Sequence, residues 1–254
     1  MKCNHNAGSF RMRPRLIACV MLVCVGIAGW ANALDWASYY SRLGIALSLA
    51  DYAWFSQQLS LIPPLIVPLM MFYHGISHTG IYAKRNMYLY PSRGAYWLTL
   101  CRDALAEAMV GSIVITICSV LPGLSGKKTL PVMNWSGAGS VFTLMTGNPL
   151  QAAVPPVVVF AGYWAAACLQ IMACLLLYGI LECRFRPFAA FIAVLLFNLA
   201  FNSPLRHSIW DWASLSYSCW AKPYGAAVLL AGWLAFIAIL YLLGRAVYRK
   251  ADVL

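Results

Sequence analysis

The run from Val157 to Leu181 contains no charged residue, and it ends at Glu182 and the basic turn Arg184-Phe185-Arg186-Pro187. A helix of about 20 apolar residues crosses the hydrocarbon core of a bilayer, which is roughly 30 Å thick. Inside lipid the backbone must satisfy its hydrogen bonds internally, and a helix does so. We therefore expect residues 157–183 to form a membrane-spanning helix that is long enough to tilt.

Comparable apolar runs recur along the chain. Hydrophobic residues make up 62% of the 254 residues and charged residues only 10%, whereas soluble proteins carry about 25% charged residues. A soluble globule could not cover this much apolar surface, so the sequence predicts an all-α, polytopic membrane protein with one transmembrane domain. The expected spans are residues 16–34, 61–83, 108–124, 157–183, 188–201 and 226–243.

The basic residues predict the orientation of these six spans. With the N-terminus inside, thirteen of the eighteen Lys and Arg residues fall in inner segments. Cytoplasmic loops of membrane proteins carry such an excess of basic residues. We therefore expect a multi-pass protein of the plasma (inner) membrane with both termini cytoplasmic. The same loops explain the net charge of +11 without a nucleic-acid partner.

The first apolar run has two interpretations. Residues 1–15 are basic and precede the run Leu16–Leu34, which is long enough to cross a membrane with Trp30 near the far interface. A basic start, an apolar core and the triplet Ala31-Asn32-Ala33 also describe a cleavable secretory signal. N-terminal sequencing of the mature protein distinguishes a retained span from a cleaved one.

Residues 35–60 have a different pattern, with aromatic and apolar residues at steps of three and four. This spacing predicts an amphipathic helix on the outer surface, with Arg42 and Asp51 on its wet side. A loop helix packed on its neighbours is the alternative.

The fifth run, residues 188–201, holds only fourteen residues and is short for a full crossing. It is followed by Asn202, Ser203 and Pro204. A half-length apolar run with this ending predicts a helix that stops early and leads into a re-entrant or outer segment between spans five and six.

The ionisable residues suggest no catalytic centre within the spans. An intramembrane hydrolase or transferase needs an acid–base pair or a metal cluster at membrane depth. His74 and His78 share a helix face, but no carboxylate or cysteine lies beside them in the sequence, so we expect packing or hydrogen bonding there. We predict that this chain is not an enzyme and has neither a metal site nor a cofactor of its own. All seven carboxylates fall at span ends or in loops: Asp35, Asp51, Asp103, Glu107, Glu182, Asp211 and Asp252.

The polar residues inside the spans are mild ones. Gln170, Asn198 and Tyr163 are uncharged and can form hydrogen bonds between helices. These three residues are our candidates for a cargo pathway, should the protein transport a substrate.

One segment between two apolar blocks concentrates charge, namely residues 84–107. It carries four basic and two acidic residues: Lys84, Arg85, Arg93, Arg102, Asp103 and Glu107. We interpret it as a cytosolic docking surface for a partner protein. A basic loop that touches anionic lipid is the alternative interpretation.

A family resemblance rests on the topology and on this segment. Six spans with both ends inside, a charged segment after the second span and a short fifth span before a broken outer segment resemble the permease subunits of type-2 ATP-binding-cassette exporters. In that family the segment after span two often reads Gly-Thr and, later, Ser/Thr-Pro, one residue, Ser-Arg. Here Gly80 and Tyr90-Pro91-Ser92-Arg93 correspond to it, without the residue between Pro and Ser.

The resemblance implies a cytosolic coupling helix after span two that docks on a separate cytosolic ATP-binding-cassette ATPase. The implied docking residues are Tyr90, Pro91, Ser92, Arg93 and Arg102. ATP and Mg²⁺ would be bound by that ATPase, and a second permease copy or a related permease would complete the transporter within the membrane lipids. The implied cargo is hydrophobic or amphipathic, such as a peptide, a lipid or a drug. Two other functions remain open, a non-transporting anchor or regulatory subunit of a membrane complex and an intramembrane enzyme.

Overall fold

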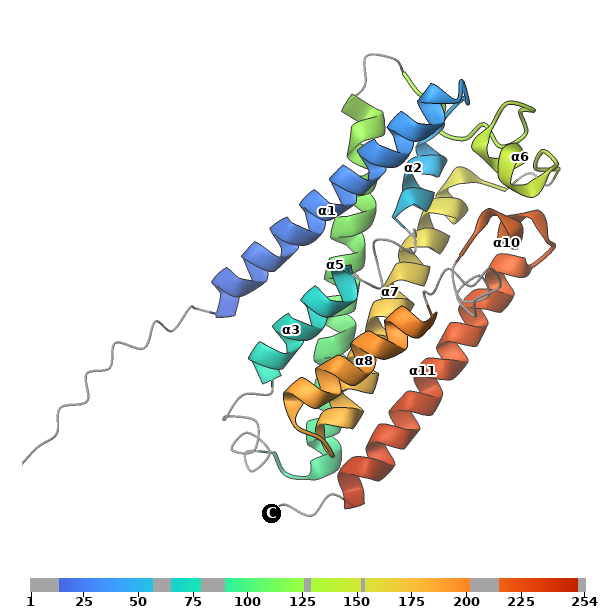
Figure 1. Ribbon diagram of the computed structural model, residues 1–254. Coiled ribbons are helices and arrows are strands. Elements are labelled where there is room, and N and C mark those ends of the chain that lie inside the picture. The colour runs from blue at the N-terminus through green and yellow to red at the C-terminus, as the bar shows by residue number, and fades with distance from the viewer. Residues whose placement is uncertain are drawn as a thin grey trace, which may run out of the picture.

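The computed structural model describes residues 14–56, 65–78, 90–125, 129–151, 154–201 and 215–250. Within these ranges the regular elements are helices, and one isolated β-bridge joins Ala46 to Ser140. Figure 1 shows the long helices side by side in a bundle. The helices are α1 (Pro14–Arg42), α2 (Leu49–Phe55), α3 (Val67–His78), α5 (Arg93–Ser125), α6 (Val141–Thr146), α7 (Pro156–Glu182), α8 (Pro187–Phe201), α10 (Tyr217–Ala221) and α11 (Gly225–Lys250).

Four of the described helices, α1, α5, α7 and α11, are long and apolar enough to cross a membrane. The expected all-α fold is therefore confirmed. Within the described residues, the other two apolar runs contain the shorter helices α3, with 12 residues, and α8, with 15. The predicted re-entrant segment after α8 falls mainly on residues 202–214, outside the described ranges.

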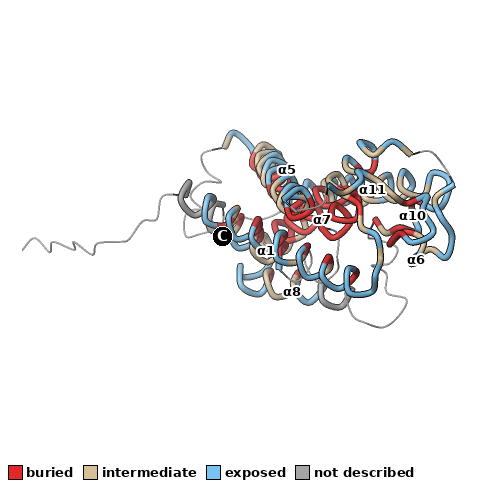
Figure 2. Tube along the Cα trace, turned by 90° about the horizontal axis from the view of Figure 1, so that it is seen from above, coloured by how far each residue is buried: buried red, intermediate tan, exposed pale blue. Residues whose placement is uncertain are grey.

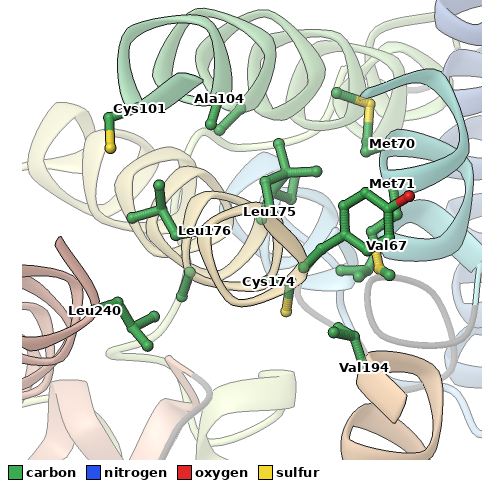
Figure 3. Packing of buried hydrophobic residues seen from close by; sticks show 14 of the residues in the cluster. Val67, Met70, Met71, Cys101, Ala104, Cys174, Leu175, Leu176, Val194 and Leu240 are labelled. Carbon is green, nitrogen blue, oxygen red and sulfur yellow. The ribbon is translucent and has the colours of Figure 1, made fainter. Parts of the chain in front are cut away.

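Helix α7 is the centre of the bundle. It packs against α3, α5, α8 and α11, and in Figure 2 it forms the buried middle of the molecule. In the most apolar stretch of α7, 67% of the residues are buried inside the protein. In the corresponding stretch of α11, 11% are buried. Close packing around α7 is visible in Figure 3, where Cys174, Leu175 and Leu176 lie between Met70 and Met71 of α3 and Leu240 of α11.

Helix α11 exposes much of its apolar surface. Its exposed side chains include Val228, Leu234, Ile239 and Leu242, each more than half accessible. Such a large exposed apolar surface is unfavourable in water and indicates contact with lipid or with another protein.

Small residues bring α1 close to α5. A Cβ atom on Gly29 would lie 3.1 Å from the carbonyl oxygen of Ile115. The hydroxyl of Ser119 donates a hydrogen bond to the Gly29 carbonyl at 3.4 Å. Glycines at such contacts are typical of helix pairs that associate in lipid, where close van der Waals contact replaces the hydrophobic effect.

The long helices extend beyond the apolar runs that predicted them. Helix α1 continues to Arg42, and α5 begins at Arg93 instead of near residue 108. The expectation of a charged segment separate from the third span is therefore corrected, because residues 93–107 are the first turns of α5. A distinct coupling helix would have to precede them, and residues 81–89 lie outside the described ranges. The physical reason is that a change in hydropathy marks where a helix can leave lipid, whereas the helix continues as long as its residues favour it.

Asp51 organises the end of the bundle where α1 ends and α7 begins. Its carboxylate is fully buried and accepts hydrogen bonds from the Ser48 amide (2.7 Å), the Ser48 hydroxyl (2.8 Å), the Trp135 indole (2.8 Å) and the Tyr217 hydroxyl (2.7 Å). We call these four residues the Asp51 cluster. The expectation that Asp51 lies on the wet side of an amphipathic helix was wrong. Asp51 is buried in the short helix α2, and its carboxylate holds α10 and the loop before α6 in place.

Candidate functional site

A concave basic surface lies where α5 begins and α11 ends. It encloses about 570 Å³, and we call it the arginine hollow. Among the described residues, its charged lining groups are three guanidinium groups. The lining residues are Ser92, Arg93, Gly94, Ala95, Leu98, Tyr241, Arg245 and Arg249.

The indole of Trp97 joins the two helices that form the hollow. Its ring stacks on Tyr248 at 5.1 Å between centroids, and its Nε1 donates a hydrogen bond to the Tyr241 carbonyl at 3.0 Å. Gly244 leaves the room that this indole occupies, since a Cβ there would collide with it. The Tyr248 hydroxyl donates to the Gly179 carbonyl at 3.1 Å, so α7 is tied to the same junction. These contacts hold α5, α7 and α11 against one another beside the hollow.

The beginning of α5 adds to the positive potential of the arginine hollow. The Ser92 hydroxyl caps the helix by accepting a hydrogen bond from the Ala95 amide at 3.1 Å. A helix N-terminus carries a partial positive charge from its free amides. Arg245 and Arg249 are four residues apart, so they share one face of α11 next to Arg93. Guanidinium groups bind carboxylate and phosphate oxygens in paired hydrogen bonds, so the hollow suits an acidic partner.

The structure brings together four of the five residues expected to dock a partner. Ser92 and Arg93 line the hollow, Pro91 is exposed beside them, and Tyr90 packs edge-on against Tyr96 at 5.2 Å. Arg102 lies farther along α5, by about 13 Å at the usual rise per residue. Its side chain is 79% exposed and lies 3.9 Å from Asp103, away from the hollow.

Sequence reasoning missed the contribution of α11. Arg245 and Arg249 were assigned only to the group of inner basic residues, although their spacing of four signals a shared helix face. Their position opposite Arg93 depends on packing between residues far apart in sequence.

The expected cargo-pathway residues are buried or outside the described side chains. Tyr163 and Gln170 both lie on the central helix α7, with exposed fractions of 0% and 3%. The Tyr163 ring lies edge-on to the Trp220 ring, with 5.9 Å between the ring centroids. Asn198 belongs to α8, and its side chain is outside the described part of the chain. The two described residues therefore line no open pathway in this conformation.

Comparisons with known protein families, with curated proteins and with solved structures found no match to this chain.

Proposed function

We propose that this chain is the transmembrane permease subunit of an ATP-binding-cassette exporter for a hydrophobic or amphipathic cargo, driven by a separate ATPase subunit. The observation that carries the proposal is the arginine hollow. It lies at the residues Pro91-Ser92-Arg93, where the resemblance to type-2 permeases requires the ATPase to dock.

Charge complementarity supports docking at this place. An ATPase that presents carboxylates would find three guanidinium groups and a helix N-terminus in one concavity. A single exposed ion pair contributes at most about 1 kcal/mol, so the three arginines act together. Most of the described basic side chains also gather toward this end of the bundle, with Arg184 and Arg186 directly after α7, whereas Arg42 and Lys222 lie at the opposite end. Such clustering favours a cytoplasmic position for the hollow.

Helix α5 provides a route for mechanical coupling. It has 33 residues and a length of about 50 Å. It begins at the arginine hollow, and near its other end Gly123 is so close to α2 that a Cβ would lie 2.9 Å from Leu49. A movement imposed on the hollow by the ATPase would travel along this helix to the Asp51 cluster at the far end.

The test is purification of the full-length protein in mild detergent from its native membranes, with identification of the proteins that remain bound. We expect an ATPase subunit with a nucleotide-binding phosphate loop, and ATP hydrolysis that increases when cargo is added. The double charge reversal Arg93→Glu/Arg245→Glu should release this subunit.

Arg42→Glu is the matched control, because Arg42 is exposed at the opposite end of the bundle. It should retain the ATPase. Equal recovery of the ATPase with the double variant, or wild-type protein that binds anionic lipid but no ATPase, would contradict the proposal.

A further inference from the structure

The arginine hollow lies where the apolar surface of α11 gives way to a basic end. The exposed apolar side chains of this helix continue to Leu242 and Leu243, and Arg245 and Arg249 follow within two turns. Figure 1 shows that the beginning of α5, which forms the other wall, lies at the same end of the bundle. In a membrane protein such a change from apolar to basic side chains marks the level of the lipid headgroups.

The three guanidinium groups of the hollow have no acidic partner within the described part of the chain. Arg93, Arg245 and Arg249 form no ion pair there, whereas Arg102 lies 3.9 Å from Asp103. Positive charges gathered in one concavity repel each other, and an anion bound between them removes part of this repulsion. Guanidinium groups bind phosphate oxygens through paired hydrogen bonds. The hollow therefore suits a phosphate group.

The other walls of the hollow suit a ligand larger than an inorganic ion. Leu98 and Ala95 line it with apolar surface, and Leu98 is mostly exposed. The Ser92 hydroxyl accepts a hydrogen bond from the Ala95 amide, and its own proton is available to a ligand. The volume of about 570 Å³ falls within the range of sites for small organic molecules. An amphipathic molecule with a phosphate group fits both kinds of wall.

An apolar track on α11 leads from the hollow toward the middle of the bundle. Ala238 and Leu234 precede Arg245 by seven and eleven residues, so the three residues share one face of the helix. Both apolar side chains are exposed. Eleven residues of helix extend over about 16 Å, close to the thickness of one leaflet of the hydrocarbon core, about 15 Å. A lipid whose phosphate lies at Arg245 can therefore place an acyl chain along this face.

We propose that the membrane-facing side of the arginine hollow binds the phosphate group of an anionic phospholipid, with an acyl chain along α11. The lipid would contact Leu98, Tyr241 and Arg245. A phosphodiester carries one negative charge, so two of the three positive charges remain. Arg93 begins α5 and Arg249 lies one residue before the end of α11, which leaves both at the mouth that the proposed function assigns to the ATPase.

The test is lipid binding by the purified full-length protein after its native lipids have been removed in detergent. Native mass spectrometry counts the lipid molecules that each chain retains when phosphatidylglycerol, which is anionic, or phosphatidylcholine, which has no net charge, is added. We expect about one phosphatidylglycerol per chain, bound about tenfold more tightly than phosphatidylcholine. An excess of inorganic phosphate should not release this lipid, because the acyl chain contributes to binding.

Arg245→Gln should weaken the binding of phosphatidylglycerol by about tenfold, since it removes a charge-assisted contact to the phosphate. Arg186→Gln is the matched control, because it removes the same charge from an exposed side chain at the same end, outside the hollow. It should bind the lipid as the wild type does. Both arginines are exposed, so neither replacement should impair folding.

Four results would overturn the inference: equal affinity of the wild type for the two lipids, equal affinity of the wild type and Arg245→Gln, an equal loss in Arg186→Gln, or release of the lipid by inorganic phosphate. The measurement uses the chain without an ATPase and is independent of the proposed function. Specific lipid binding by a chain that recruits no ATPase would contradict the proposed function alone. An ATPase bound to a chain without specific lipid binding would contradict this inference alone.

Discussion

Replacement of Asp51 by alanine should destabilise the end of the bundle where α2 and α10 meet. Four donors lose their acceptor: the amide and hydroxyl of Ser48, the indole of Trp135 and the hydroxyl of Tyr217. Ser48 and Trp135 are fully buried and Tyr217 is 2% exposed, so water cannot easily replace the carboxylate. Each unsatisfied buried donor costs about 1–3 kcal/mol, and removal of the buried charge offsets part of that. We expect the free energy of unfolding to fall by about 4 kcal/mol in total.

The assay is unfolding of the full-length protein in mild detergent, followed by tryptophan fluorescence. Trp54 and Trp135 are both buried next to Tyr217, so loss of this packing changes their emission. Asp35→Ala is the matched control, because Asp35 is exposed and makes no comparable cluster. If Asp51→Ala unfolds at the same denaturant concentration as Asp35→Ala, the Asp51 cluster does not hold this end together.

Three further predictions use the same unfolding assay. Gly244→Val should lower the free energy of unfolding by about 1–3 kcal/mol, because it displaces the Trp97 indole. Gly232→Val, which has open space around it, should unfold like the wild type. Equal losses in both variants would refute this packing. Trp135→Phe removes one donor to Asp51 and replaces the indole with a smaller phenyl ring, so it should lower the free energy of unfolding by at least about 1–2 kcal/mol, and no loss would exclude that bond. Burial raises the pKa of the Asp51 carboxyl, against the effect of its hydrogen bonds, so the folded chain holds this proton to a higher pH than the unfolded chain does. Stability should therefore fall as the pH rises from the unfolded pKa through the folded pKa, and a pH profile unchanged in Asp51→Asn would contradict this.

The apolar runs predicted the helices of the bundle but not their full lengths. Residues 157–183 correspond to α7 (Pro156–Glu182), and residues 188–201 to α8 (Pro187–Phe201). Helix α5 was expected from residue 108 and begins at Arg93. Hydropathy locates the part of a helix that lipid can surround, and it carries little information on turns that continue into water.

The contacts between distant residues could not be predicted from a single sequence. Asp51 meets residues 84 and 166 positions away, and the burial of its carboxylate follows from those contacts. Glu107 was placed at a span end, and the partner that buries it is 33 residues away on α3. Local patterns report helix faces, whereas the choice of which faces meet depends on packing of the whole bundle.

Site-specific crosslinking from the arginine hollow tests the central claim most directly. A photoreactive residue at Leu98, which lines the hollow and is 57% exposed, should capture an ATPase subunit in native membranes. The same residue at Leu43, 54% exposed at the opposite end, should not capture it. Capture of lipid alone from Leu98, or of the ATPase from Leu43 instead, would contradict a docking role for the hollow.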